Sequence, residues 1–111
     1  MSRKNDLDIL HHAALRVKDV QEAVEWYTRR FHCKVEYQDD TWAMLEFENV
    51  RLAFVLAEEH PPHIAILGDP AAFGEPDVHR DGTASVYVKD PNGNNVEILQ
   101  LAPEVSSAGK A

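Results

Sequence analysis

The clearest structural information in this 111-residue sequence lies in Asp90-Pro91-Asn92-Gly93-Asn94-Asn95-Val96-Glu97-Ile98. The proline and the Asn-Gly pair are typical of the loop in a β-hairpin. We therefore predict strands on either side, over Thr83–Lys89 and Asn95–Leu101. Glu97 then stands on the second strand, just after the loop. A carboxylate there is a candidate ligand, because a strand holds a side chain more rigidly than a loop does.

The first half of the sequence predicts one helix among four strands. Leu7–Val17 is the first predicted strand, and Asp19 with Glu22 three residues later resembles the capping box of a helix start. Apolar side chains then fall on one helical stripe: Val20, Ala23, Val24, Tyr27 and Phe31. Three short strands follow, over residues 34–37, 42–48 and 51–56. The order of elements is β-α-β-β-β.

The second half begins with a strand over His63–Leu67, and it contains a weak internal repeat of the first half. His63-Ile64-Ala65 resembles His12-Ala13-Ala14, because each tripeptide has a histidine with an alanine two residues later. The segment Gly68–Gly82 differs from the first half, since Pro70, Gly74 and Pro76 exclude a long helix. We predict an α+β chain whose second half is shortened.

Composition limits the possible partners. Nineteen acidic and eleven basic residues give a net charge of −8, which repels nucleic acids and anionic membranes. No apolar run approaches the roughly 20 residues that span a bilayer. Met1–Asp6 lacks the apolar segment of a secretory signal, and the single Cys33 cannot form an internal disulfide. A cytoplasmic protein is expected, with one domain over residues 7–101 and disordered ends at 1–6 and 102–111.

His12, His63 and Glu97 are the candidate metal ligands. Alternating faces place His12 beside Ala14 and His63 beside Ala65, and these small neighbours leave space above each imidazole. Two imidazoles and one carboxylate suit Zn²⁺, Fe²⁺, Mn²⁺ or Ni²⁺ and leave positions for a small-molecule substrate. The metal would act as a Lewis acid, or would hold a chelating substrate beside O₂. Buried histidines with other partners, or surface histidines, are the alternatives.

Three segments resemble signatures of the vicinal oxygen chelate superfamily. The first is Leu10-His11-His12-Ala13-Ala14-Leu15-Arg16-Val17 with Asp19 and Ala23-Val24-Glu25-Trp26-Tyr27, and the others are His60–Ala65 and Asp90–Ile98. That superfamily includes glyoxalase I, fosfomycin-resistance proteins, extradiol dioxygenases, methylmalonyl-CoA epimerase and metal-free bleomycin-resistance proteins. The resemblance covers roughly Leu7–Leu101. It implies paired βαβββ modules, about 7–57 and 63–101, whose curved mixed sheet forms a cup, with the second helix missing or reduced.

The resemblance also implies which residues form the site. His12, His63 and Glu97 match three ligand positions of the superfamily. A fourth is expected within Arg51–Leu56, where glyoxalase-type members often have glutamate, but this chain has none there. The remaining three ligands resemble a dioxygenase or fosfomycin-resistance set and argue against glyoxalase I. His11 is expected to face the opposite side of its strand.

Other polar and aromatic residues are candidates for substrate contacts. Arg16, on the His12 face, could bind a carboxylate or phosphate, or could be a solvated edge residue. Trp42, Phe54 and Tyr87 could line the cavity, with core packing as the alternative for each. His79 could close over the site from the shortened segment or be exposed. Glu46 and Glu58 are candidate general bases, and no residue is assigned to that role.

Two main functions remain open at this point. The first is a small metal-dependent lyase, isomerase or dioxygenase that acts on an oxygenated substrate. The second is a metal-free protein that binds or sequesters a small molecule, as bleomycin-resistance proteins do. A structural domain with a decayed site is a third reading. The missing helix would expose apolar sheet surface, which favours a homodimer.

Overall fold

The computed structural model describes residues 6–102, so the two ends predicted to be disordered lie outside it except for Asp6 and Ala102. Within this range the elements in chain order are β1 (Leu10–Val17), α1 (Val20–Arg30), β2 (Lys34–Gln38), β3 (Trp42–Glu46), β4 (Arg51–Leu56), β5 (His63–Leu67), the 3-10 helix η2 (Pro70–Ala72), β6 (Asp77–Val78), β7 (Ala84–Lys89) and β8 (Asn95–Gln100). No helix among these residues is long and apolar enough to cross a membrane.

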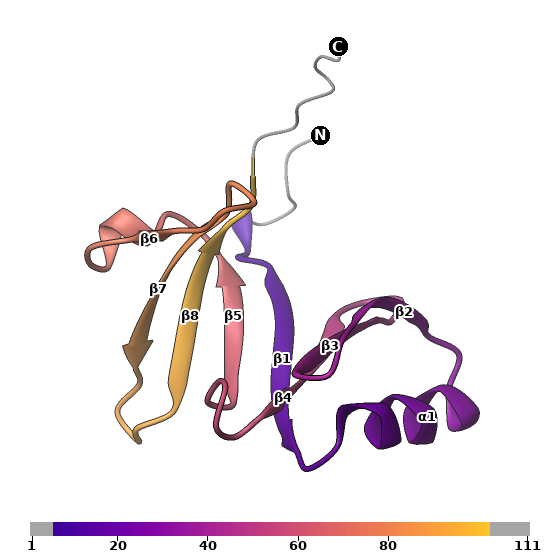
Figure 1. The fold of residues 1–111 in the computed structure, drawn as a ribbon. Helices are drawn as coiled ribbons and strands as arrows, with labels where there is room; N and C mark the ends of the chain where they lie inside the picture. Colours follow the sequence, from indigo (N-terminus) through magenta and orange to yellow (C-terminus); the bar gives the residue numbers. More distant parts are fainter. Residues whose placement is uncertain (1–5, 103–111) are drawn as a thin grey trace.

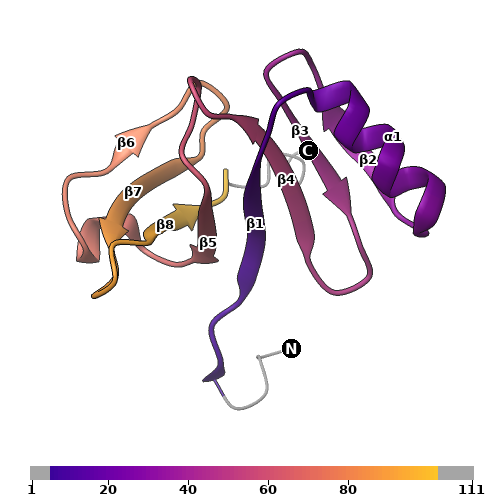
Figure 2. The same ribbon diagram turned by 90° about the horizontal axis from the view of Figure 1, so that it is seen from below.

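The strands form one mixed sheet in the order β2-β3-β4-β1-β5-β8-β7-β6. β1 pairs with β4 and β5 pairs with β8 in parallel, while the other neighbours are antiparallel. The sheet curves without closing (Figure 1). In Figure 2, β1 runs between α1 with β2–β4 on one side and β5–β8 on the other. The predicted α+β class and curved mixed sheet are confirmed.

Helix α1 begins as the sequence predicts and covers one face of the first half. The Asp19 carboxylate accepts a hydrogen bond of 2.9 Å from the backbone N–H of Glu22, which satisfies one of the free donors at the helix start. On the face that meets the sheet, Val20 and Val24 are buried. They pack in a core cluster with Ala43, Leu45 and Phe54. We call this face of the sheet the helix face.

The N-cap supplies a first prediction about stability. Replacing Asp19 with alanine should lower the free energy of unfolding by about 1 kcal/mol, because the N–H of Glu22 loses its side-chain acceptor. Urea unfolding followed by circular dichroism measures this difference. Lys18→Ala is the matched control at an exposed neighbouring position and should change stability by less than about 0.5 kcal/mol. An equal effect of the two substitutions would contradict the capping role.

The pairing registers show that the two halves repeat the same arrangement. On β1, Ala14 pairs with Ala53 of the parallel strand β4. On β5, Ala65 pairs with Glu97 of the parallel strand β8. Since Ala14 and Ala65 each follow a histidine by two residues, the weak repeat in the sequence corresponds to a repeat in the topology. Position 53 in the first half is therefore the counterpart of position 97 in the second.

The second half carries only a remnant of a helix, as predicted. η2 has three residues, with Asp69 as its N-cap, and Pro70 is fully buried. A Cβ on Gly74 would lie 3.3 Å from the Val86 side chain, so this segment runs close against β7. The two-residue strand β6 that follows was not predicted, because the proline and glycine residues around it hide any strand pattern.

A second small core lies on the opposite face of the sheet. Ala14, Ala53 and Val55 are buried there, and Trp42 and Met44 pack against them. Because side chains alternate along a strand, His12 shares this face with Ala14. We call it the site face.

Candidate metal centre

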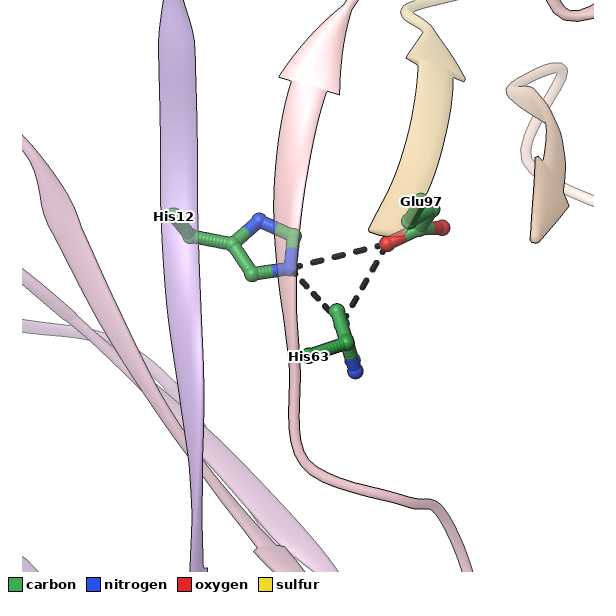
Figure 3. Close-up of side chains that lie close together, drawn as sticks. All are labelled: His12, His63 and Glu97. Carbon is green, nitrogen blue, oxygen red and sulfur yellow. Dashed lines mark hydrogen bonds and ion pairs between the residues drawn. The ribbon is translucent and has the colours of Figure 1, made fainter. Parts of the chain in front are cut away.

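His12, His63 and Glu97 converge from three neighbouring strands. His12 on β1 pairs with Ala65 on β5, and Ala65 pairs with Glu97 on β8. His63 stands two residues before Ala65, so all three side chains lie on the site face. They point toward one another in Figure 3. Ala65 is fully buried between them, and its small side chain leaves the space that the ligand atoms occupy.

The separations of the three donor atoms fit a shared metal ion. The Nε2 atoms of His12 and His63 are 3.2 Å apart. Glu97 Oε1 lies 3.3 Å from His63 Nε2 and 3.7 Å from His12 Nε2. Donors bound to one ion at about 2.0–2.2 Å, with angles between octahedral and tetrahedral, lie about 2.8–3.6 Å from each other. Two of the three separations fall within this range, and the third, between His12 and Glu97, is slightly longer. The three residues can therefore hold a divalent metal.

The other ring nitrogen of each histidine has its own partner. His63 Nδ1 lies 2.9 Å from the carbonyl oxygen of Pro61, so Nδ1–H donates to that oxygen and Nε2 faces the site. His12 Nδ1 lies 2.8 Å from His11 Nδ1. If His12 offers the Nε2 lone pair to a metal, its Nδ1–H donates to His11. Each imidazole is thus oriented by a hydrogen-bonding partner at Nδ1, on the side away from the other ligands.

The position of His11 corrects the prediction that it faces the opposite side. The pairing of β1 with β5 shifts register between Leu10 and His12, which marks an irregularity of the β-bulge type. Strict alternation fails at such a point. The His11 ring meets the His12 ring edge-on, with centroids 5.1 Å apart.

Burial and the carboxylate shift the pKa values of the two histidines in opposite directions. Burial lowers the pKa of His12 to about 4, although Glu97 opposes this change. Burial also acts to lower the pKa of His63, but hydrogen bonds with Glu97 and Pro61 outweigh it and leave that pKa raised. Burial acts to raise the pKa of Glu97, but hydrogen bonding to His63 and Ser85 together with the charges of His63 and His12 leaves that pKa lowered. Without a metal, His63 is therefore the first of the three side chains to take up a proton as the pH falls.

This difference predicts how metal binding depends on pH. At about pH 5.5, binding of one Zn²⁺ ion should release about one proton, from His63, because His12 and Glu97 are already deprotonated. Each further unit of acidification should weaken the apparent affinity about tenfold. Titration calorimetry in two buffers with different ionisation enthalpies counts the protons. Release of two protons would contradict the lowered pKa of His12.

The position that corresponds to Glu97 in the first half is occupied by Ala53. Its side chain is buried against Ala14, Val55 and the partly buried Trp42 and Met44. An alanine side chain cannot bind a metal. Where a glutamate ligand would stand in Arg51–Leu56, this chain has an alanine packed among apolar side chains. The site has three protein ligands to offer.

The predicted substrate-contact residues fall in different places. Trp42 packs on the site face over Ala14 and Ala53, with Tyr37 stacked on it at a centroid distance of 4.4 Å. The Tyr87 ring meets His63 edge-on at 5.3 Å. Burial and the nearby Glu97 raise the pKa of the Tyr87 hydroxyl, so it stays protonated at neutral pH. In the strand order, β3 with Trp42 and β7 with Tyr87 lie on opposite sides of the three strands that carry the candidate ligands.

Phe54 and Arg16 lie away from the three ligands. Phe54 is fully buried on the helix face, beside Tyr27, and therefore does not line the site face. Arg16 shares the His12 face by alternation, but it is exposed near the end of β1 and lines a hollow with Lys18 and Glu58. Glu58 itself lies in the turn after β4.

Arg51 is a neighbour of the site that no sequence pattern indicated. It pairs with His12 in the register of β1 and β4, and its charge acts to lower the pKa of His12. Its Nε donates to Glu36 at 2.7 Å, and Glu46 is its partner on β3. Only the strand register brings these residues together, so sequence spacing could not have identified them.

Comparisons with known proteins agree with this fold. The family model described as "Glyoxalase/Bleomycin resistance protein/Dioxygenase superfamily" matches residues 9–76, which include His12 and His63. No curated protein matches the chain in sequence. A hypothetical protein from Bacillus halodurans C-125 superposes with a TM-score of 0.68 at 16% identity, covering 86% of this chain and 96% of that one.

Two further solved structures are similar. One is described as an NAD-dependent benzaldehyde dehydrogenase from Legionella pneumophila, with a TM-score of 0.63, 16% identity and coverage of 81% of this chain and 97% of that one. The other is a lactoylglutathione lyase from Agrobacterium tumefaciens, with a TM-score of 0.44, 16% identity and coverage of 88% and 96%. Since the family model matches more than half of the sequence, the chain belongs to the Glyoxalase/Bleomycin resistance protein/Dioxygenase superfamily.

Proposed function

We propose that the protein is a metal-dependent enzyme, a lyase, isomerase or dioxygenase, acting on a small substrate that chelates through adjacent oxygen atoms. The observation that carries the proposal is the triangle of donor atoms, two Nε2 atoms and one Oε1 atom, separated by 3.2, 3.3 and 3.7 Å. His12, His63 and Glu97 would hold Zn²⁺, Fe²⁺, Mn²⁺ or Ni²⁺. A bound ion supplies Lewis-acid stabilisation of negative charge on a substrate oxygen.

The chain's own residues give the surroundings that such a reaction needs. His11 and the Pro61 carbonyl hold the two imidazoles in place. Trp42 and Met44 offer an apolar surface on the site face. Tyr87, which stays protonated beside His63, can donate a hydrogen bond to a substrate oxygen. Glu46, which pairs with Arg51 in the strand register, is the nearer of the two candidate general bases.

A chelating probe tests this proposal. Acetohydroxamate carries two adjacent oxygen atoms, and it should bind the Zn²⁺-loaded protein but not the metal-free protein in a calorimetric titration. His12→Ala should abolish this binding, whereas His32→Ala, at an exposed histidine after α1, should leave it intact. A protein that holds the metal but does not bind the hydroxamate would contradict an open coordination site. Compounds with adjacent oxygens are then screened for turnover.

One observation favours the metal-free alternative. The three side chains can satisfy one another with a single shared proton, because Glu97 keeps the pKa of His63 raised. A protein of this second kind would bind a small molecule on the site face with the histidines and Glu97 as hydrogen-bonding groups. Metal content separates the two functions, since only the enzyme needs the ion.

In this proposal the protein works as a homodimer in the cytoplasm. Large apolar side chains are exposed in the second half, where the helix is reduced: Ile64, Phe73 and Val78. Pairing of two subunits would cover such side chains. Sedimentation equilibrium should give twice the mass of the 12.5 kDa chain. A monomer at micromolar concentration would contradict this part of the proposal.

A further inference from the structure

A third buried polar residue lies beside the candidate metal ligands. Among the described residues, the buried polar or charged ones are His12, Glu97 and Ser85. Ser85 is on β7, opposite Leu99 of β8, so it shares the site face with Glu97 and is its diagonal neighbour on the adjoining strand. Only 2% of Ser85 is exposed, and a hydroxyl so deeply buried needs hydrogen-bonding partners.

Ser85 has a partner on each side. Its Oγ lies 3.0 Å from Nε2 of His79. Glu97 is its diagonal neighbour on the adjoining strand, and hydrogen bonding between the Ser85 hydroxyl and the Glu97 carboxylate acts to lower the pKa of Glu97. An ionised carboxylate can only accept, and a hydroxyl has a single hydrogen to donate. A Ser85 O–H that donates to Glu97 therefore requires His79 Nε2–H to donate to Ser85.

The turn between β6 and β7 fixes His79 over Ser85. The backbone N–H of His79 donates to the carbonyl of Thr83 at 2.8 Å, and that of Gly82 donates to the carbonyl of His79 at 3.0 Å. Gly82 has φ of +89°, which glycine adopts without strain. The Asp81 carboxylate accepts hydrogen bonds from the backbone N–H and the hydroxyl of Thr83. These hydrogen bonds fix the backbone that carries the His79 imidazole.

We propose that His79 and Ser85 are positioning residues that hold the Glu97 carboxylate toward His12 and His63. His79 orients the Ser85 hydroxyl, and that hydroxyl restrains the rotation of Glu97, so that one carboxylate oxygen stays directed at the two Nε2 atoms. This role rests on the proposed function, because a metal is the partner for which Glu97 is positioned. Hydrogen-bonding partners behind a metal ligand typically change metal affinity 10–100-fold when removed.

The direction of the hydrogen-bond chain is testable without a metal. Spectra of ¹⁵N-labelled protein that correlate ring nitrogens with ring hydrogens distinguish the two histidine tautomers. In the metal-free native protein, His79 should carry its hydrogen on Nε2, and Ser85→Ala should remove this preference. An Nδ1–H tautomer of His79, or a tautomer unaffected by Ser85→Ala, would overturn the proposed chain.

Metal affinity provides the second arm of the test. Competition with a chromophoric chelator should show Zn²⁺ binding weakened about 10–100-fold in Ser85→Ala and in His79→Phe. His79→Gln keeps an N–H donor and should recover most of the loss, while the exposed neighbour Arg80→Ala should bind as the native protein does. Thermal unfolding of the metal-free variants separates weakened zinc binding from loss of structure. Because His79 is exposed and Ser85 is buried, substitution of His79 should disturb the fold less.

The outcomes distinguish this inference from the proposed function. Native affinity in both folded variants would overturn the positioning role, even if the protein binds metal. A native protein that binds no Zn²⁺ but shows the Nε2–H tautomer and its loss in Ser85→Ala would overturn the metal enzyme. In that case the hydrogen-bond chain that holds Glu97 would stand.

Discussion

Replacing Phe54 with alanine should lower the free energy of unfolding by about 3–5 kcal/mol. Phe54 is fully buried in the core under α1, where its ring lies 4.9 Å from that of Tyr27. The substitution removes the buried ring and leaves a cavity between the helix and the sheet. A loss of this size is a large part of the total stability of a small domain. Urea unfolding of the metal-free protein measures it directly.

The control for this prediction is Phe73→Ala, because Phe73 follows η2 and is 57% exposed. That variant should change stability by less than about 1 kcal/mol, since most of its ring stays in contact with water. The folded fraction of Phe54→Ala should bind hydroxamate like the native protein, because Phe54 lies on the helix face. A nearly native stability combined with weakened ligand binding would instead place Phe54 in the binding site.

Replacing His63 with alanine should weaken Zn²⁺ binding by more than about 100-fold, beyond the loss caused by removing an outer hydrogen-bonding partner. The variant loses one of three donor atoms and also the hydrogen bond from Nδ1 to Pro61. Chelator competition measures the affinity. In the same assay His32→Ala, at an exposed histidine, should retain native affinity. Equal affinities of the two variants would mean that zinc binds elsewhere.

Much of the fold could be predicted because local patterns agreed with the final packing. The bounds of β4 and β5 are those predicted, and Asp19 caps α1 as its sequence pattern indicates. The strand β6 was missed, since two residues are too few to form a periodic pattern. The division of the chain into modules at 7–57 and 63–101 stays a prediction.

The site could be predicted only where a residue type carries its own chemical meaning. Histidine and glutamate are recognisable metal ligands, so His12, His63 and Glu97 could be grouped from the sequence and the family resemblance. Cavity lining and core packing could not be told apart for Phe54, because both faces of β4 are apolar and alternation alone does not tell which face meets the helix. Ser85 has no sequence signal at all. Its role depends on the pairing of β7 with β8 and on a turn that brings His79 within 3.0 Å.

Measurement of metal content shows whether His12, His63 and Glu97 form a metal site. The protein is purified without an affinity tag, and its metals are measured by mass spectrometry before and after reconstitution with Zn²⁺, Fe²⁺, Mn²⁺ and Ni²⁺. We expect about one equivalent of a divalent transition metal per chain, lost in His12→Ala, His63→Ala and Glu97→Ala. A native chain that holds no metal after every reconstitution would contradict the metal enzyme and leave the metal-free binding protein as the function.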